Sequence, residues 1–309
     1  MAPDFKEQKV LATLHKPPPA ARVVRWKCPT LAGCARPLPV AAPFSAARER
    51  GAVQRRPSVG ATAIVALMRL PQGAHHDLAL RRTDVSFEGL RHPVATLEAA
   101  RVDDVLETVV DEDHVYAARL WPSSFVAART LLRHLEIERE AVVCEIGCGP
   151  GLPSLAALAA GARSVIAVDM SPLALSLVSH AARAYQPSRA PRLTTVQRNL
   201  LQSDGETPIR CDYLVVADLL YDLPTAQAVG RYVGRHVRRD GATAIIADPG
   251  RMNGKGRAAF ARGLVQSDCI SAVGSPRARF TEEGLPRRWR GVQKDATMGV
   301  LVLEPEREV

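Results

Sequence analysis

Three kinds of feature are scarce or missing in this chain of 309 residues. Aromatic residues make up only 5% of it, so aliphatic and alanine side chains must fill its core. None of the six cysteines forms a CxxC pair and no histidine cluster completes a zinc set, which argues against a zinc site. Cys144, Cys148 and Cys211 lie in apolar strand or turn contexts, which is typical of buried free thiols. No apolar run approaches the roughly 18 residues of a membrane span. We therefore expect a protein of a reducing compartment, with no metal centre and no membrane partner.

Acidic residues are scarce in residues 1–82. This segment has 14 Lys and Arg but only 4 Asp and Glu, a net charge of +10, and it holds 10 of the 23 prolines. The totals of 41 basic and 32 acidic residues leave 27 and 28 for residues 83–309, a net charge of −1. The first segment predicts a disordered basic extension, either an organelle transit peptide or a simple tail. The near-neutral remainder argues against a nucleic-acid partner.

A regular alternation of strand and helix patterns begins at about residue 115, after a short lead-in over residues 83–114 that predicts a strand pair or a helix. Such alternation is typical of a parallel sheet with helices on both faces. We therefore expect a doubly wound, Rossmann-like α/β domain over residues 115–309. Its strands are predicted at 141–146, 164–168, 193–197, 213–217, 242–247 and 298–303, and its helices at 125–135, 152–160, 172–185, 225–237 and 256–266.

A glycine-rich turn follows the first of these strands, at Gly147, Gly149 and Gly151. Its spacing is G-x-G-x-G, whereas a dinucleotide fingerprint is G-x-G-x-x-G and would place its third glycine where Leu152 stands. The strand also carries Glu145 at its end. A carboxylate there would repel a pyrophosphate and attract the ammonium group of a methionine moiety. The turn therefore favours S-adenosylmethionine over a dinucleotide as its ligand.

Further polar side chains follow the second and third strands. Asp169 ends the second strand, 18 residues after Gly151, where an acid accepts hydrogen bonds from ribose hydroxyls in this architecture; Met170 is beside it. Asn199 and Leu200 follow the third strand, at the edge that faces an adenine ring. The alternatives are an ordinary turn aspartate at 169 and an exposed turn asparagine at 199.

An acid and a phenol, Asp218 and Tyr221, follow the fourth strand three residues apart. Reacting groups gather at the carboxyl ends of parallel strands, so both side chains are candidates for the mouth of the active site. The structural alternative is a helix-capping aspartate and a packed tyrosine.

On these residues the chain resembles the class I, seven-strand methyltransferases, and within them the methyltransferase 16 family of protein lysine methyltransferases. The matching motifs are Trp121-Pro122 in the lead-in, Glu145 with the three glycines, and Asp218-Leu-Leu-Tyr221. The segment Asp248-Pro-Gly-Arg251, with Tyr221-Asp222, is similar to the branch that methylates the electron-transfer flavoprotein beta subunit. The resemblance covers about two-thirds of the chain.

The resemblance implies S-adenosylmethionine as cofactor, a protein substrate that presents a lysine, and a mitochondrial location. It adds Trp121 to the cofactor-binding residues and makes Asp218 and Tyr221 catalytic, with Asp218 also near the cofactor. Other interpretations stay open: a methyltransferase acting on a small molecule, a cofactor-binding scaffold without turnover, a cytoplasmic location, and, more remotely, an NAD-dependent oxidoreductase. The identity of the acceptor, the number of methyl groups transferred and the oligomeric state do not follow from the sequence.

Overall fold

The computed structural model describes residues 59–68, 78–101, 105, 116–135, 140–202, 209–250, 254–267, 277–284 and 297–305. The strands are β1 (Val59–Met68), β2 (Leu78–Val85), β3 (Val94–Ala99), β4 (Val142–Ile146), β5 (Ser164–Asp169), β6 (Leu193–Gln197), β7 (Tyr213–Ala217), β8 (Thr243–Asp248), β9 (Arg277–Gly284) and β10 (Thr297–Glu304). The helices are α4 (Pro122–Leu135), α5 (Leu152–Ala160), α6 (Pro172–Tyr185), α7 (Leu223–Arg235) and α8 (Lys255–Gln266), with short turns η2 (Ala190–Arg192) and η3 (His236–Asp240).

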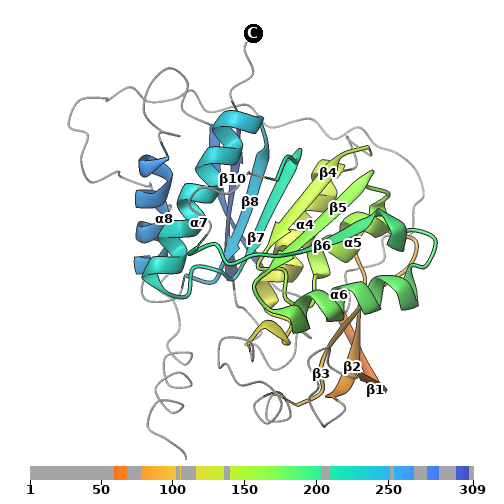
Figure 1. Ribbon diagram of the computed structural model, residues 1–309. Helices are drawn as coiled ribbons and strands as arrows, with labels where there is room; N and C mark the ends of the chain where they lie inside the picture. Colours follow the sequence, from red (N-terminus) through yellow and green to blue (C-terminus); the bar gives the residue numbers. More distant parts are fainter. Residues whose placement is uncertain are drawn as a thin grey trace, which may run out of the picture. The chain divides into compact units, whose positions relative to one another are not determined.

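The main sheet has seven strands in the order β6-β5-β4-β7-β8-β10-β9 (Figure 1). Strands β6, β5, β4, β7 and β8 are parallel to one another, and β10 pairs antiparallel with both β8 and β9. The register places Ile146 opposite Val168 on β5 and Val216 on β7. The carboxyl ends of the parallel strands therefore share one edge, and the predicted doubly wound, mostly parallel sheet is confirmed.

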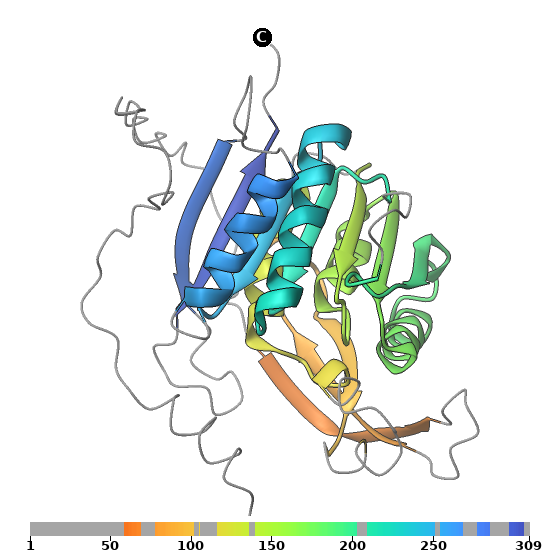
Figure 2. The same ribbon diagram turned by 60° about the vertical axis from the view of Figure 1, so that its left-hand side comes forward.

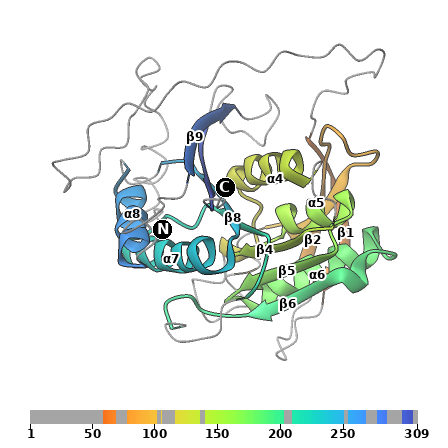
Figure 3. The same ribbon diagram turned by 90° about the horizontal axis from the view of Figure 1, so that it is seen from above.

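Helices cover both faces of this sheet because successive strand residues point to opposite sides. Val143 and Val165 pack with buried residues of α4, α5 and α6, whereas Cys144 and Ile146 pack with those of α7 and α8. Figures 2 and 3 show α7 and α4 on opposite sides of the sheet. Burial on both faces explains why the parallel strands appear in the sequence as continuous apolar runs.

Helices α7 and α8 lie against each other at a crossing that only glycine permits. A Cβ atom on Gly230 would lie 2.1 Å from the carbonyl oxygen of Phe260, and one on Gly263 would lie 2.1 Å from that of Gln227. Both obstacles are backbone atoms, so a side chain at either position would push the helices apart.

Helix boundaries follow local capping chemistry. Ser171 caps α6 as predicted, accepting a hydrogen bond from the amide of Ala174, and the helix runs to Tyr185. Helix α7 begins two residues before the predicted start because Asp222 caps it through the amide of Thr225. It also ends earlier than predicted, at Arg235, and the five residues of η3 continue as a π-helical turn to the left-handed Gly241.

The structure differs from the sequence prediction at both ends of the domain. Residues 59–68 form β1 and residues 78–85 form β2, so the predicted disorder of residues 1–82 is wrong for these parts. Strand β2 alternates buried and half-buried residues, and its arginines concealed that pattern. It pairs antiparallel with β1 and β3. Strand β9 was not predicted either, while residues 1–58 and the transit-peptide interpretation lie outside the described residues.

The described ranges contain neither a candidate metal cluster nor a candidate membrane span. No group of three or more His, Cys, Asp or Glu residues there has the arrangement to hold a metal ion. None of the helices in those ranges combines the length and apolarity that crossing a bilayer requires. Cys144, Cys148 and Cys211 are buried free thiols.

Candidate cofactor and active site

The turn between β4 and α5 is built from three glycines in left-handed backbone conformations. Their φ angles are 61° at Gly147, 50° at Gly149 and 70° at Gly151. Space excludes other residues as well: a Cβ atom on Gly151 would lie 2.3 Å from Val178 Cγ2, and one on Gly147 would lie 2.5 Å from Leu219. The turn therefore exposes backbone at the N-terminus of α5, a position that suits an anionic or polar ligand group.

Glu145 lies behind this turn, completely buried on β4. Its Oε2 atom accepts hydrogen bonds from the amide and the hydroxyl of Ser154, at 2.8 Å and 2.5 Å. Burial raises the pKa of Glu145 to about 8, against the two Ser154 hydrogen bonds that lower it, and the charge of Asp169 raises it further. Within the described residues, Oε1 has no hydrogen-bond partner. A buried carboxylate oxygen in this state fits a cationic ligand group such as an ammonium.

Asp169, at the carboxyl end of β5, is 6% exposed and holds the glycine turn. Its Oδ2 atom accepts a hydrogen bond from the amide of Gly149 at 2.9 Å, and its Oδ1 atom accepts one from the amide of Ser171, also at 2.9 Å. Each carboxylate oxygen can accept more than one hydrogen bond, so these contacts leave capacity for a ribose hydroxyl. The half-buried Met170 follows, and its carbonyl oxygen accepts a hydrogen bond from Gln197.

Asn199 and Leu200 follow the edge strand β6, two strands away from β4. Asn199 Oδ1 accepts a hydrogen bond from the amide of Leu201 at 2.9 Å, so its side-chain carbonyl serves the turn in which it lies. Leu200 packs against the apolar cluster under α7. These two residues thus have local structural roles in addition to the adenine contact predicted for them.

Asp218 follows β7 in a left-handed conformation, with φ 61°. Its amide donates a hydrogen bond to the carbonyl oxygen of Ala247 on β8, and its Oδ2 atom accepts one from the hydroxyl of Ser123 on α4 at 3.1 Å. The side chain is 7% exposed, whereas that of Tyr221 is 47% exposed. A buried carboxylate and an exposed phenol, three residues apart, therefore follow the carboxyl end of β7. The helix cap of α7 is not Asp218, as the structural alternative held, but Asp222.

Trp121 belongs to residues 116–121, which pack on the glycine turn and are called the lead-in segment from here on. Its Nε1 atom donates a hydrogen bond to the carbonyl oxygen of Tyr116 at 3.1 Å, and the guanidinium of Arg119 lies 5.4 Å from the centroid of its ring. The carbonyl oxygen of Ala117 lies 3.2 Å from where a Cβ atom on Gly149 would be. The lead-in and the turn are thus in direct contact.

Arg257 of α8 fixes the turn after β8. Its Nε atom donates to Asp248 Oδ2 and its Nη2 atom donates to the carbonyl oxygen of Asp248, both at 2.7 Å. Asp248 Oδ2 also accepts a hydrogen bond from the amide of Gly250 at 2.8 Å. Asp248 is therefore engaged by its own turn and by α8; Arg251, the last residue of that motif, lies outside the described residues.

Four buried polar residues at the site were not found from the sequence: Thr96, Glu98, Ser123 and Ser154. Ser123 and Ser154 bond Asp218 and Glu145, which the sequence had singled out. Thr96 and Glu98 bond Pro150 and Leu120, the chain neighbours of the turn glycines and of Trp121. The only signal for them was their position, since Ser123 follows the Trp121-Pro122 motif and Ser154 lies in the first turn of α5.

Comparisons with known proteins find methyltransferases. A family described as "Methyltransferase domain" matches residues 144–243. The electron transfer flavoprotein beta subunit lysine methyltransferase of Danio rerio is 29% identical over 136 residues, which are 44% of this chain and 50% of that protein. The Homo sapiens protein of the same name is 26% identical, with 44% and 50% covered. The chain thus spans about half the length of these relatives.

Among solved structures, the N-methyltransferase NodS from Bradyrhizobium japonicum, in complex with S-adenosyl-L-homocysteine, aligns with a TM-score of 0.44 and 15% sequence identity. The alignment covers 67% of this chain and 99% of that one.

Proposed function

We propose that this chain, which contains a class I methyltransferase domain with S-adenosylmethionine as its cofactor, transfers the methyl group of that cofactor to a lysine side chain of a protein. One observation carries the proposal more than any other. The buried Oε1 atom of Glu145 has no partner within the described residues, at a turn of three left-handed glycines beside the carboxyl end of β7. The alternatives, a small-molecule acceptor and a scaffold without turnover, are outcomes of the test below.

The cofactor supplies a methyl group bonded to a sulfonium, a good leaving group, so positioning carries much of the rate. We assign its ammonium to Glu145, because attraction to a cation offsets the cost of burying a carboxylate. Backbone at Gly147, Gly149 and Gly151 leaves room for the ligand. Asp169 would bond the ribose, with Met170 beside it. Asn199 and Leu200 would border the adenine, and Trp121 and Asp218 would border the methionine end.

The acceptor must lose a proton before it can attack. An ordinary lysine pKa of about 10.4 makes deprotonation at pH 7 cost about 4.6 kcal/mol. Asp218 is suited to orient the amine and accept its proton, directly or through water, because its carboxylate is buried and held by Ser123. The exposed phenol of Tyr221 would bond the amine nitrogen. Desolvation of the bound lysine would lower its pKa and reduce the cost.

Exposed apolar side chains support the proposal of a protein substrate. Four exposed large apolar residues follow strands or precede α4 around the carboxyl edge of the sheet: Tyr116, Leu201, Tyr221 and Leu223. The matching relatives are named for methylating the electron transfer flavoprotein beta subunit, which makes that protein the first substrate to test. A mitochondrial location accompanies this substrate in the proposal.

The test is transfer of tritiated methyl groups from S-adenosylmethionine to purified electron transfer flavoprotein and to whole-cell and mitochondrial lysates. We expect one labelled protein band. Asp218→Asn should lower the rate by about 100-fold or more at saturating cofactor. Asp212→Asn is the matched control, because Asp212 precedes the opposite end of β7 and Asn keeps an acceptor for the amide of Val142.

Each other outcome rejects part of the proposal. Labelled small molecules without a labelled protein would replace the lysine acceptor. No label in any fraction, with cofactor bound, would favour a scaffold. Full turnover in Asp218→Asn would remove Asp218 from the mechanism.

A further inference from the structure

Strand β3 carries two polar side chains in a completely buried setting. All six of its residues are buried, and Thr96 and Glu98 are both 0% exposed. The two positions are two residues apart and share one side of the strand. Buried hydroxyls and carboxylates are retained where they bond specific partners, so the identity of those partners defines what this strand does.

The partner of Thr96 is the glycine turn itself. The Thr96 hydroxyl donates a hydrogen bond of 2.8 Å to the carbonyl oxygen of Pro150, which lies between Gly149 and Gly151. Pro150 fixes its own φ angle and has no amide hydrogen, so its carbonyl oxygen is the backbone polar group through which the turn can be held at this residue. Thr96 therefore anchors the turn at its centre.

Glu98 holds the other side of the turn through the lead-in segment. Its Oε2 atom accepts a hydrogen bond from the amide of Leu120 at 3.2 Å, and its Oε1 atom accepts one from the Thr83 hydroxyl at 2.9 Å. The amide of Ala99 adds a hydrogen bond of 3.0 Å to the carbonyl oxygen of Ala118. This segment in turn packs on Gly149.

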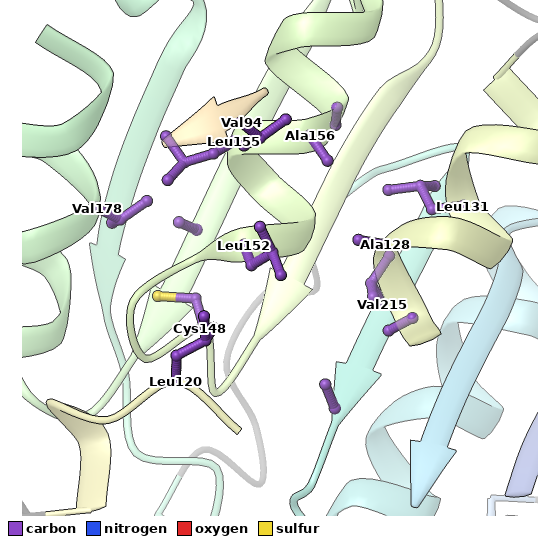
Figure 4. Packing of buried hydrophobic residues seen from close by; sticks show 14 of the residues in the cluster. Val94, Leu120, Ala128, Leu131, Cys148, Leu152, Leu155, Ala156, Val178 and Val215 are labelled. Atoms are coloured by element: carbon purple, nitrogen blue, oxygen red, sulfur yellow. The ribbon is translucent and has the colours of Figure 1, made fainter. Parts of the chain in front are cut away.

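Apolar contacts accompany these bonds. Strand β3 contacts both α5 and α6. Figure 4 shows Val94 of β3 near Leu155 of α5, and Leu120 of the lead-in beside Cys148 of the turn. The three-stranded sheet is thus packed, through β3, onto the helix that follows the glycine turn.

We infer that Thr96 and Glu98 are positioning residues of the cofactor site, and that the three-stranded sheet holds the glycine turn in the conformation that binds S-adenosylmethionine. Gly147, Gly149 and Gly151 all have φ near +60°. Ordering them costs a free loop conformational entropy, because glycine loses more backbone freedom on being fixed than any other residue. The hydrogen bonds to Pro150 and Leu120 offset this entropy cost in the free protein, before the cofactor binds. The inference rests on the cofactor and not on the lysine acceptor.

The test measures binding of S-adenosylmethionine to the full chain by calorimetry. Thr96→Val keeps the shape but removes the hydroxyl, and we expect it to weaken binding about 5- to 10-fold, the equivalent of one lost hydrogen bond. Thr96→Ser should restore binding. With an acceptor in hand, KM for the cofactor should rise while kcat at saturation stays near the wild-type value.

Thr130→Val is the matched control. Thr130 is a buried threonine of α4 whose hydroxyl has no hydrogen-bond partner within the described residues. It should leave cofactor binding unchanged. If Thr96→Val does not fold, Glu98→Gln is the second variant, because it alters the contact between β3 and Leu120 of the lead-in segment. We expect it to weaken cofactor binding by several-fold.

Equal affinity in wild type and Thr96→Val would overturn the inference, as would an equal loss in Thr130→Val. Failure to find a methyl acceptor would reject the proposed function alone, because cofactor binding is measured without one.

Discussion

Ser154 donates two hydrogen bonds to one oxygen of Glu145, from its amide and from its hydroxyl. The other oxygen is buried and, as far as the described residues extend, has no hydrogen-bond partner. Burial raises the pKa of Glu145 to about 8, so the carboxyl group is mostly protonated at pH 7 in the free protein. The cation of the cofactor favours the ionised form, which links cofactor binding to proton release.

The first prediction is that S-adenosylmethionine binding at pH 7 releases most of one proton, and that this release declines above about pH 8. Calorimetry at one pH in buffers of different ionisation enthalpy measures it. Glu145→Gln should bind more weakly and release none. Equal proton release by wild type and Glu145→Gln would show that another group titrates.

The same pKa affects the stability of the free protein. The folded-state pKa lies above the ordinary value of 4.5, so the folded protein holds a proton that the unfolded chain loses first. The stability contributed by this group is fully present below about pH 4.5 and is lost as the pH rises to about 8. Denaturant unfolding should show that Glu145→Gln loses less stability across this range than wild type.

Alanine variants of two glycines distinguish the cost of backbone strain from the cost of a steric clash. Gly151 and Gly161 both have left-handed φ angles, but a Cβ atom meets Val178 at 2.3 Å in the first case and nothing within 4 Å in the second. Gly161→Ala should cost about 1 kcal/mol of unfolding free energy. Gly151→Ala should cost about 2–4 kcal/mol and abolish measurable cofactor binding, because overpacking adds to strain. Equal costs in denaturant unfolding would contradict the predicted clash.

Ser123 should affect turnover without affecting cofactor affinity. Its hydroxyl donates to Asp218 Oδ2 at 3.1 Å and lies 3.6 Å from the sulfur of Met298. Ser123→Ala removes the bond that orients the carboxylate, and we expect kcat to fall about 5- to 10-fold. Cofactor affinity by calorimetry should match wild type. The opposite pattern, weaker binding with normal kcat, would place Ser123 in the cofactor site.

The Arg257–Asp248 contact should require a guanidinium. Arg257 donates from two different nitrogens to the side chain and the backbone of Asp248, a geometry that lysine does not reproduce. Arg257→Lys should lower the unfolding free energy by about 1–2 kcal/mol. Arg262→Lys, on the exposed face of the same helix, is the control and should change it by less than about 0.5 kcal/mol. Indistinguishable variants would show that the paired hydrogen bonds contribute nothing.

Elements whose bounds depend on local signals could be predicted from the sequence. Helix α5 lies between two glycines, and α6 begins with a serine cap and a proline, so both were predicted with their observed bounds. Strands β6 and β7 were also predicted at their observed limits. The carboxyl-edge positions of Glu145, Asp169 and Asp218 followed from this order, although their roles stay predictions.

Contacts with distant partners could not be predicted. Strand β3 lies in the segment for which a strand pair or a helix was expected, but its Thr96 and Glu98 look like exposed polar residues in the sequence, whereas both are buried and bond Pro150 and Leu120. Glu283 of β9 pairs with Arg129 and Arg133 of α4, about 150 residues away. Asn199 accepts a hydrogen bond from the amide of Leu201, a contact within its own turn that fits the alternative of a turn asparagine.

The most direct test of the account is a calorimetric titration of the purified chain with S-adenosylmethionine and, separately, with NAD. We predict saturable one-site binding of S-adenosylmethionine, loss of that binding in Gly151→Ala, and no heat with NAD. Tight binding of NAD with no heat from S-adenosylmethionine would contradict the assignment of Glu145 and the glycine turn as the S-adenosylmethionine-binding site.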